Sequence, residues 1–225
     1  QLRDDSPNSA FTWPIIEATV LLSTAAVANQ PIQPPPLSNP RPVNWSGHDI
    51  YPDRLFHGER LRLIKHVDLW SEEGIDFEIE VPRRDNAVRH TRIPLFSVWP
   101  MLLDGIVSSF PLWRSHEKFS GAISLPFRAR RINFYAAGFS EGARLRGYFR
   151  LKSVTPRSHA ADIQISDGNG NLLIHLRGWE ELCERVPQEY HNYILHPSER
   201  YLTQELPLEM LGNPATPVAS AVANE

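Results

Sequence analysis

An aspartate in the middle of an apolar run is the residue of this sequence best suited to chemistry. Asp104 lies within VWPMLLDGIVSSF at 98–110, where apolar residues cover most of the circumference of a helix. Helical spacing places Met101, Gly105 and Ser108 on the same narrow stripe. The two small residues are expected to leave room for a ligand, and apolar surroundings favour a protonated carboxyl. Asp104 is therefore a candidate general acid, unless it faces solvent or pairs with an arginine.

Several strands are predicted around that helix. The helix is expected to be capped by Ser97, to have Pro100 in its first turn, and to stop at Pro111. Alternation of polar and apolar residues predicts strands at 60–69, 75–81, 123–134, 144–153, 161–166 and 172–179. Asp167-Gly168-Asn169-Gly170 predicts a hairpin between the last two strands. The fold class is α+β, an antiparallel β-sheet wrapped around a long central helix.

The N-terminal region differs from this pattern. Residues 15–23 are apolar and β-branched, which predicts a strand, and a lone strand must pair with other strands. We expect it to end a preceding unit that lies upstream of residue 1, since the sequence lacks an initiating Met. Six prolines between Pro31 and Pro42 predict an extended linker. Residues 213–225 have no periodicity and predict a loosely held tail.

Composition excludes several classes of function. The 225 residues carry a net charge of −3, which does not favour nucleic-acid binding, and no apolar run is long enough to cross a membrane. Cys183 is the only cysteine, so no intramolecular disulfide or cysteine-based zinc cluster is expected, and the cytoplasm is the default compartment. The nine histidines lack metal-ligand spacing, which predicts no metal site.

Two motifs resemble those of a known family. Leu55-Phe56-His57-Gly58-Glu59-Arg60-Leu61 resembles a Phe-His-Gly-Pro strand entry, with Glu59 in place of proline. Trp99-Pro100-Met101-Leu102-Leu103-Asp104 resembles a helix start of the form His-Pro-x-x-Leu-Asp, with Trp99 in place of histidine. Both belong to the dehydratase domains of polyketide synthases, which are double hotdog folds. The resemblance covers about residues 15–185 and mainly concerns the C-terminal hotdog half.

The resemblance implies a role for each candidate site residue. Asp104 occupies the position of the catalytic acid, which protonates the departing β-hydroxyl of an acyl thioester. His57, Gly58, Pro100 and Ser108 occupy substrate-binding positions, and Ser108 stands where a glutamine or histidine commonly supports the acid. The family's base is a histidine in a His-x-x-x-Gly-x-x-x-x-Pro motif of the first hotdog. This sequence contains no such motif, so the base is expected outside this chain.

The resemblance also implies an organisation and partners. Residues 1–30 would end a preceding hotdog, 31–48 form a Pro-rich linker, 49–186 the hotdog with the Asp104 helix, and 187–225 a C-terminal extension and flexible tail. The implied function is a hydro-lyase that removes water from a β-hydroxyacyl chain. The chain would be carried on the phosphopantetheine of an acyl carrier protein, and no other cofactor is expected. The upstream hotdog half and a second copy in a homodimer would be further partners.

Other interpretations stay open at this point. A dehydratase-like hotdog that binds or shapes the acyl chain without catalysis is favoured by Ser108, Trp99 and the missing histidine motif. An isomerase or product-template activity would use the same acid. Six tryptophans and six tyrosines suggest a small carbohydrate or peptide binder, but they follow no repeating spacing. Six arginines form either a docking face for a carrier protein or the solvated side of a sheet: Arg128, Arg130, Arg131, Arg144, Arg146 and Arg150.

Overall fold

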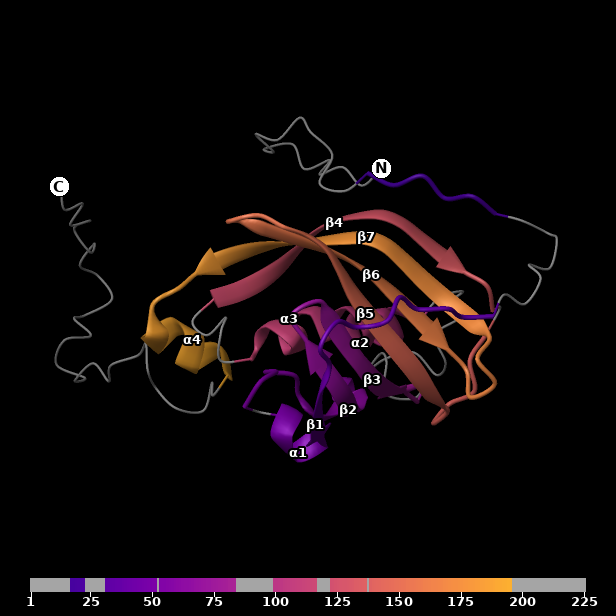
Figure 1. Ribbon diagram of the computed structural model, residues 1–225, viewed down its shortest axis with the longest axis horizontal. Coiled ribbons are helices and arrows are strands. Elements are labelled where there is room, and N and C mark those ends of the chain that lie inside the picture. Colours follow the sequence, from indigo (N-terminus) through magenta and orange to yellow (C-terminus); the bar gives the residue numbers. More distant parts are fainter. Residues whose placement is uncertain are drawn as a thin grey trace, which may run out of the picture.

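A curved antiparallel sheet forms the body of the protein in the computed structural model, which describes residues 17–22, 31–51, 53–83, 99–116, 122–136 and 138–195. Its seven strands follow the order β1-β2-β3-β5-β6-β7-β4 and arch over two short helices, α2 and α3 (Figure 1). The strands are β1 (Arg41–Ser46), β2 (Ile64–Ser71), β3 (Gly74–Glu80), β4 (Ala122–Phe134), β5 (Arg144–Val154), β6 (Ser158–Ser166) and β7 (Leu172–Arg185). The helical elements are α1 (Gly47–Ile50), η1 (Glu59–Leu61), α2 (Pro100–Val107), α3 (Ser109–Arg114) and α4 (Gln188–Leu195).

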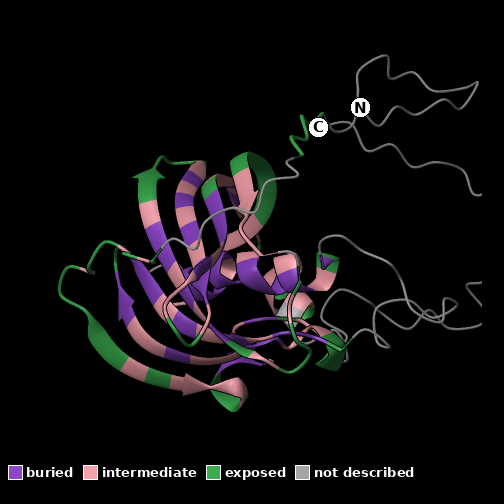
Figure 2. Ribbon diagram, turned by 90° about the vertical axis from the view of Figure 1, so that its right-hand side faces the viewer, coloured by how far each residue is buried: buried purple, intermediate pink, exposed green. Residues whose placement is uncertain are grey.

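The period-two pattern of the sequence explains the strands. In β3, Ile75, Phe77 and Ile79 are completely buried, and the residues between them are half-buried. Buried and less buried residues alternate along several strands (Figure 2). The predicted α+β class and the antiparallel meander of β5, β6 and β7 are confirmed. β7 runs further than expected, to Arg185, because Gly178 adopts a φ of 55° where the register of β6 and β7 shifts.

The central helix differs from the prediction. It is two helices, α2 and α3, that meet at Ser108, and the second continues past the predicted end. The prediction that Pro111 stops the helix is wrong. Pro111 is the third residue of α3, and a first-turn position needs no N–H because it has no acceptor within the helix. Pro100 begins α2 as expected, after Trp99, whereas Ser97 lies outside the described residues.

Aromatic side chains attach α3 to the sheet. The ring of Phe110 meets the ring of Phe149 edge-on, with centroids 5.1 Å apart. The indole N–H of Trp70 donates to the carbonyl oxygen of Trp113 at 3.1 Å, and the indole N–H of Trp113 donates to that of Ser71 at 2.9 Å. These reciprocal bonds satisfy two buried donors and fix α3 on the end of β2.

Gly105 brings α2 close to the sheet. A Cβ atom at this position would lie 2.8 Å from Cδ1 of Leu63 and 3.1 Å from Cδ1 of Ile79. Gly105 therefore faces the core, and the expectation that it leaves room for a ligand beside Asp104 is wrong. Its function is to permit the close helix-to-sheet contact that sets the depth of α2.

The predicted linker at 31–48 contains a strand and is part of the domain. Residues 41–46 form β1, which pairs antiparallel with β2 at the end of the sheet. Pro42 is tolerated there because an edge strand does not need every N–H. Asn44, with a φ of 50°, lies where the register shifts between Pro42 and Trp45. Further upstream, the Nε–H of Arg150 donates to the carbonyl oxygen of Pro35 at 2.6 Å.

The expected strand at 15–23 is not formed in the part that the structure describes. Residues 17–22 have no regular secondary structure, and Val20, Leu21 and Leu22 are largely exposed. The pairing of this segment with a preceding unit stays a prediction, and the tail at 213–225 lies outside the described residues. Among the described helices, none has the length and apolar character needed to span a membrane.

Candidate active site

Asp104 presents one carboxyl oxygen to solvent and buries the other. Its side chain is 47% exposed, yet its Oδ2 atom is buried and has no hydrogen-bond partner among the described residues. Oδ1 is therefore the oxygen that can reach a ligand. The apolar surroundings expected from the sequence are not complete in this chain alone, since half of the side chain is exposed.

His57 lies against the buried side of this carboxyl. Its Nε2 atom is 3.5 Å from Oδ2 of Asp104 and 3.3 Å from Oγ of Ser108, and its side chain is 10% exposed. Nε2 makes a hydrogen bond to Ser108, whereas its contact with Asp104 is longer and is one of charge. Three of the residues selected from the sequence thus meet in space, although the turn before η1 and helix α2 are far apart in the chain.

The hydroxyl of Ser108 identifies which nitrogen of His57 carries a proton. Ser108 Oγ donates to the main-chain carbonyl oxygen of Asp104 at 2.7 Å, a common bond for serine one turn further along a helix. Its proton is used there, so Oγ accepts from Nε2–H of His57. Nδ1 of His57 is buried and has no hydrogen-bond partner among the described residues.

This arrangement is not a nucleophilic serine site. In a Ser-His-Asp relay the carboxylate binds one ring nitrogen and the serine binds the other. Here Asp104 and Ser108 both contact Nε2 of His57, and the serine proton points to a main-chain oxygen. The cluster is therefore a carboxyl with a histidine beside it, suited to proton transfer rather than acylation.

One contact positions the ring of His57 and another positions its main chain. The ring stacks on Phe56 with centroids 4.8 Å apart and planes 13° apart. The Nε–H of Arg62 donates to the carbonyl oxygen of His57 at 3.2 Å. Gly58 follows as the residue before η1, and Pro100 is exposed in the first turn of α2, four residues before Asp104.

Two residues near the site were not predicted. Tyr51 is buried, and burial raises the pKa of its hydroxyl to about 12, against the lowering effects of a main-chain bond to Ile64 and the charge of Arg62. The charge of Asp104 raises this pKa further. The guanidinium of Arg62 lies 5.6 Å from the centre of the Tyr51 ring. Both residues lie close in sequence to the His57-Gly58 motif. Their proximity to this motif is the sequence signal that could have identified them.

A second polar cluster lies beneath β7 and near the end of α3. Glu181 is only 2% exposed, and burial raises the pKa of its carboxyl to about 7. Hydrogen bonds from Trp179 and Ser124 and the charge of Arg114 lower it by smaller amounts. His159, the cross-strand partner of Glu181, is also buried, and burial followed by Arg114 lowers the pKa of its ring. This cluster is suited to pH-dependent stability, not to substrate contact.

We expect Glu181 to make folding stability fall as pH rises from about 4.5 to about 7. The folded-state pKa lies above the unfolded value, so the folded protein binds one proton more in this window. The loss is on the order of 3 kcal/mol in the free energy of unfolding. Urea unfolding of the wild type and of Glu181→Gln across this range measures it. If the free energy of unfolding depended on pH equally in the two proteins, the prediction would be contradicted. His159 is present in both proteins, so its titration cancels when the two curves are subtracted.

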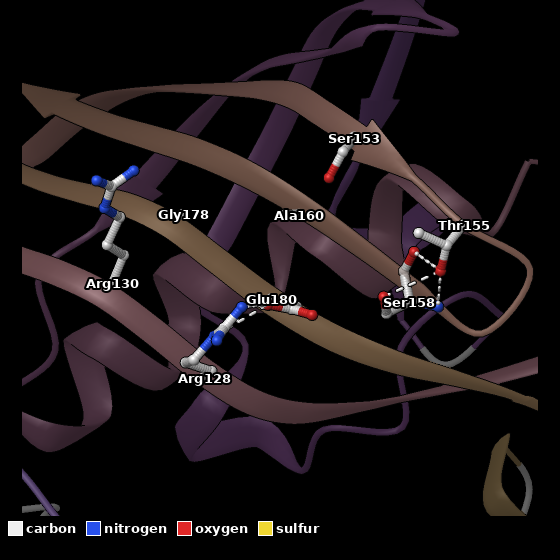
Figure 3. A pocket seen from close by; sticks show the side chains of 8 residues that line it. All are labelled: Arg128, Arg130, Ser153, Thr155, Ser158, Ala160, Gly178 and Glu180. Atoms are coloured by element: carbon white, nitrogen blue, oxygen red, sulfur yellow. Dashed lines mark hydrogen bonds and ion pairs between the residues drawn. The ribbon is translucent and has the colours of Figure 1, made fainter.

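A polar hollow of about 470 Å³ lies on the outer face of the sheet, opposite the helices (Figure 3). It is lined by Arg128, Arg130, Ser153, Thr155, Ser158, Ala160, Gly178 and Glu180. Most of the six arginines selected from the sequence pair with carboxylates on other strands of the sheet instead of forming one basic surface. The pairs are Arg128–Glu180, Arg144–Glu78, Arg144–Glu80, Arg146–Asp68 and Arg150–Asp76. This pairing favours the interpretation of the six arginines as the solvated side of a sheet over a docking face for a carrier protein.

Comparison with known proteins identifies the class. Residues 33–189 match the family described as the polyketide synthase dehydratase N-terminal domain. The match covers more than half of the sequence, and the chain therefore belongs to the polyketide synthase dehydratase family. The family description names an N-terminal domain, whereas the motifs around His57 and Asp104 resemble the C-terminal hotdog, so the assignment to that half belongs to the proposal below. No curated protein matches the chain.

Solved structures show the same fold. The dehydratase domain of RzxB from Pseudomonas fluorescens is 15% identical, with a TM-score of 0.51, over 69% of this chain and 54% of that one. The dehydratase domain from the CurJ module of the curacin polyketide synthase is 22% identical, with a TM-score of 0.50, over 63% and 50%. A GphF dehydratase variant is 22% identical, with a TM-score of 0.50, over 73% and 55%. The chain thus spans about half the length of these structures.

Proposed function

We propose that this chain is the acid-bearing hotdog half of a dehydratase that removes water from a β-hydroxyacyl thioester. The observation that carries the proposal is the carboxyl of Asp104, whose Oδ1 is open to a ligand while Oδ2 is buried beside His57. A carboxyl that offers one oxygen outward is the arrangement a general acid requires. The match to the dehydratase family supports the choice of reaction.

The reaction is an elimination with two proton transfers. A base removes the proton next to the thioester carbonyl, the electron pair forms the carbon–carbon double bond, and the bond to the β-hydroxyl breaks. Asp104 gives its proton to that leaving hydroxyl, which departs as water, and the carboxylate is reprotonated afterwards. The base is proposed to come from the other hotdog half. The two transfers need no metal or redox cofactor, and the phosphopantetheine of an acyl carrier protein holds the substrate.

The remaining candidate residues are proposed to shape the substrate path. Gly58 directly follows His57, before η1, and Pro100 begins the helix that carries Asp104. Ser108 ends the same helix and is proposed to border the substrate path there. The acyl carrier protein and the other hotdog half are the proposed partners, with a homodimer as the assembly and the cytoplasm as the compartment.

One observation favours a second candidate function. The carboxyl of Asp104 is 47% exposed, and this sequence supplies no base of the family's kind. A hotdog that holds or shapes the acyl chain without eliminating water would have the same appearance. An isomerase would use the same acid to move a double bond.

The test is turnover of a carrier-bound substrate by the complete synthase polypeptide. A β-hydroxyacyl chain on the holo-carrier is incubated with the protein, and loss of one water is followed by mass spectrometry. We expect the mass of the dehydrated product. Binding of the acyl-carrier without any loss of water would replace the proposal with the non-catalytic function. Migration of a double bond at constant mass, seen by NMR of an unsaturated substrate, would replace it with isomerisation.

A further inference from the structure

The buried oxygen of Asp104 needs a hydrogen-bond donor. Oδ2 has almost no solvent-accessible surface, and no described residue donates a hydrogen bond to it. A buried acceptor without a donor costs free energy, most of all when it carries charge. During proton transfer Asp104 becomes a carboxylate, so the need for a donor at Oδ2 increases as the reaction proceeds.

Among the described residues, His57 is the donor that contacts Oδ2. The hydroxyl proton of Ser108 is held by the main-chain oxygen of Asp104 at 2.7 Å. The Nε–H of Arg62 is held by the carbonyl oxygen of His57 at 3.2 Å. Nε2–H of His57 lies 3.5 Å from Oδ2 and makes only a long bond of 3.3 Å to Ser108. A bond to Oδ2 requires the ring to turn from Ser108 toward Asp104, and catalytic hydrogen bonds are often long before substrate is bound.

We infer that His57 is a positioning residue for Asp104, which donates from Nε2 to Oδ2 and thereby directs the acid's proton to Oδ1. This inference rests on the proposed function of Asp104 as the acid. With Oδ2 occupied as an acceptor, the proton resides on the oxygen that faces the ligand. As that proton leaves, charge spreads over both oxygens, and the bond from His57 strengthens in the transition state. The assignment differs from substrate lining, because it places the effect of His57 on kcat and not on KM.

Two isosteric substitutions separate these roles. His57→Gln places an amide N–H near the position of Nε2, whereas His57→Asn places it near Nδ1, away from Oδ2. Both variants keep a polar side chain beside Phe56. We expect His57→Asn to lower kcat about 10- to 100-fold with little change in KM, and His57→Gln to stay within about 3-fold of the wild type. Equal losses in both variants, or a loss confined to KM, would overturn the inference.

A spectroscopic measurement tests the contact without turnover. Nitrogen-15 NMR of histidine-labelled protein assigns the proton of His57 to Nε2 or to Nδ1. We expect a protonated Nε2 whose shift changes in Asp104→Asn and is unchanged in Asp53→Asn, an exposed aspartate outside the site. A protonated Nδ1, or no response to Asp104→Asn, overturns the inference. If the wild type fails to dehydrate but these shifts are as expected, the contact stands and the proposed function fails instead.

Discussion

Asparagine at position 104 is expected to abolish most of the turnover of carrier-bound substrate. Asp104→Asn keeps the size and the hydrogen-bonding reach of the side chain but removes the proton that the leaving hydroxyl needs. General acid catalysis of this kind contributes about 10²- to 10⁴-fold in rate, so kcat is expected to fall by that factor. KM is expected to change little, because the amide occupies the same space. Mass spectrometry of the acyl-carrier under single-turnover conditions measures both.

The control for this experiment is Asp53→Asn. Asp53 is exposed in a turn outside the site, and the same change of charge there is expected to leave kcat within about 2-fold of the wild type. A matching melting temperature for Asp104→Asn shows that the domain remains folded. Residual activity of Asp104→Asn above a tenth of the wild-type value would show that another group supplies the proton.

Removal of the Arg150 guanidinium is expected to cost about 3–5 kcal/mol of folding stability. This side chain is 9% exposed, and its Nη1 lies 2.7 Å from Oδ1 of Asp76. The same nitrogen donates to the carbonyl oxygens of Ile75 and Phe149, so its N–H bonds point there and the contact with Asp76 is one of charge. Arg150→Met removes the charge beside Asp76 and the bonds to these two carbonyl oxygens, and it releases the carbonyl of Pro35 from Nε. The melting temperature is expected to fall by about 10 °C.

Two further variants establish the cause of that loss. Arg150→Met combined with Asp76→Leu removes both charges and is expected to recover most of the stability, since apolar replacements of a buried pair are often neutral. Arg144→Met removes an arginine that pairs with Glu78 and Glu80 but is half exposed, and it is expected to cost less than about 1 kcal/mol. A loss for Arg144→Met as large as that for Arg150→Met would contradict the role of burial.

Periodicity predicted most of the sheet because burial on one face leaves a regular trace in the sequence. Ile75, Phe77 and Ile79 alternate with charged residues, and the structure buries all three. The helix around Asp104 was predicted from apolar residues that cover most of its circumference and from Pro100 in its first turn. Its end was misplaced because Pro111 was treated as a stop signal. A proline is equally compatible with the first turn of a new helix, and only the three-dimensional path separates the two cases.

The contacts of the site could be predicted only in part. The resemblance to dehydratase domains selected His57, Ser108 and Asp104 separately, but no spacing rule indicates that Nε2 of His57 meets both of the others. That contact depends on how deeply α2 packs, which the short distance from Gly105 to Leu63 determines. The strand within the predicted linker was missed because its prolines conceal an edge strand.

The reciprocal bonds between α3 and β2 have a consequence for how the domain opens. The indole protons of Trp70 and Trp113 are each held by a main-chain oxygen on the other element. They can exchange with solvent deuterium only when α3 separates from the end of β2, whereas fraying of the outer strands leaves them protected. The exchange rates of the two indole protons therefore report how often α3, the helix that follows Asp104, separates from the sheet.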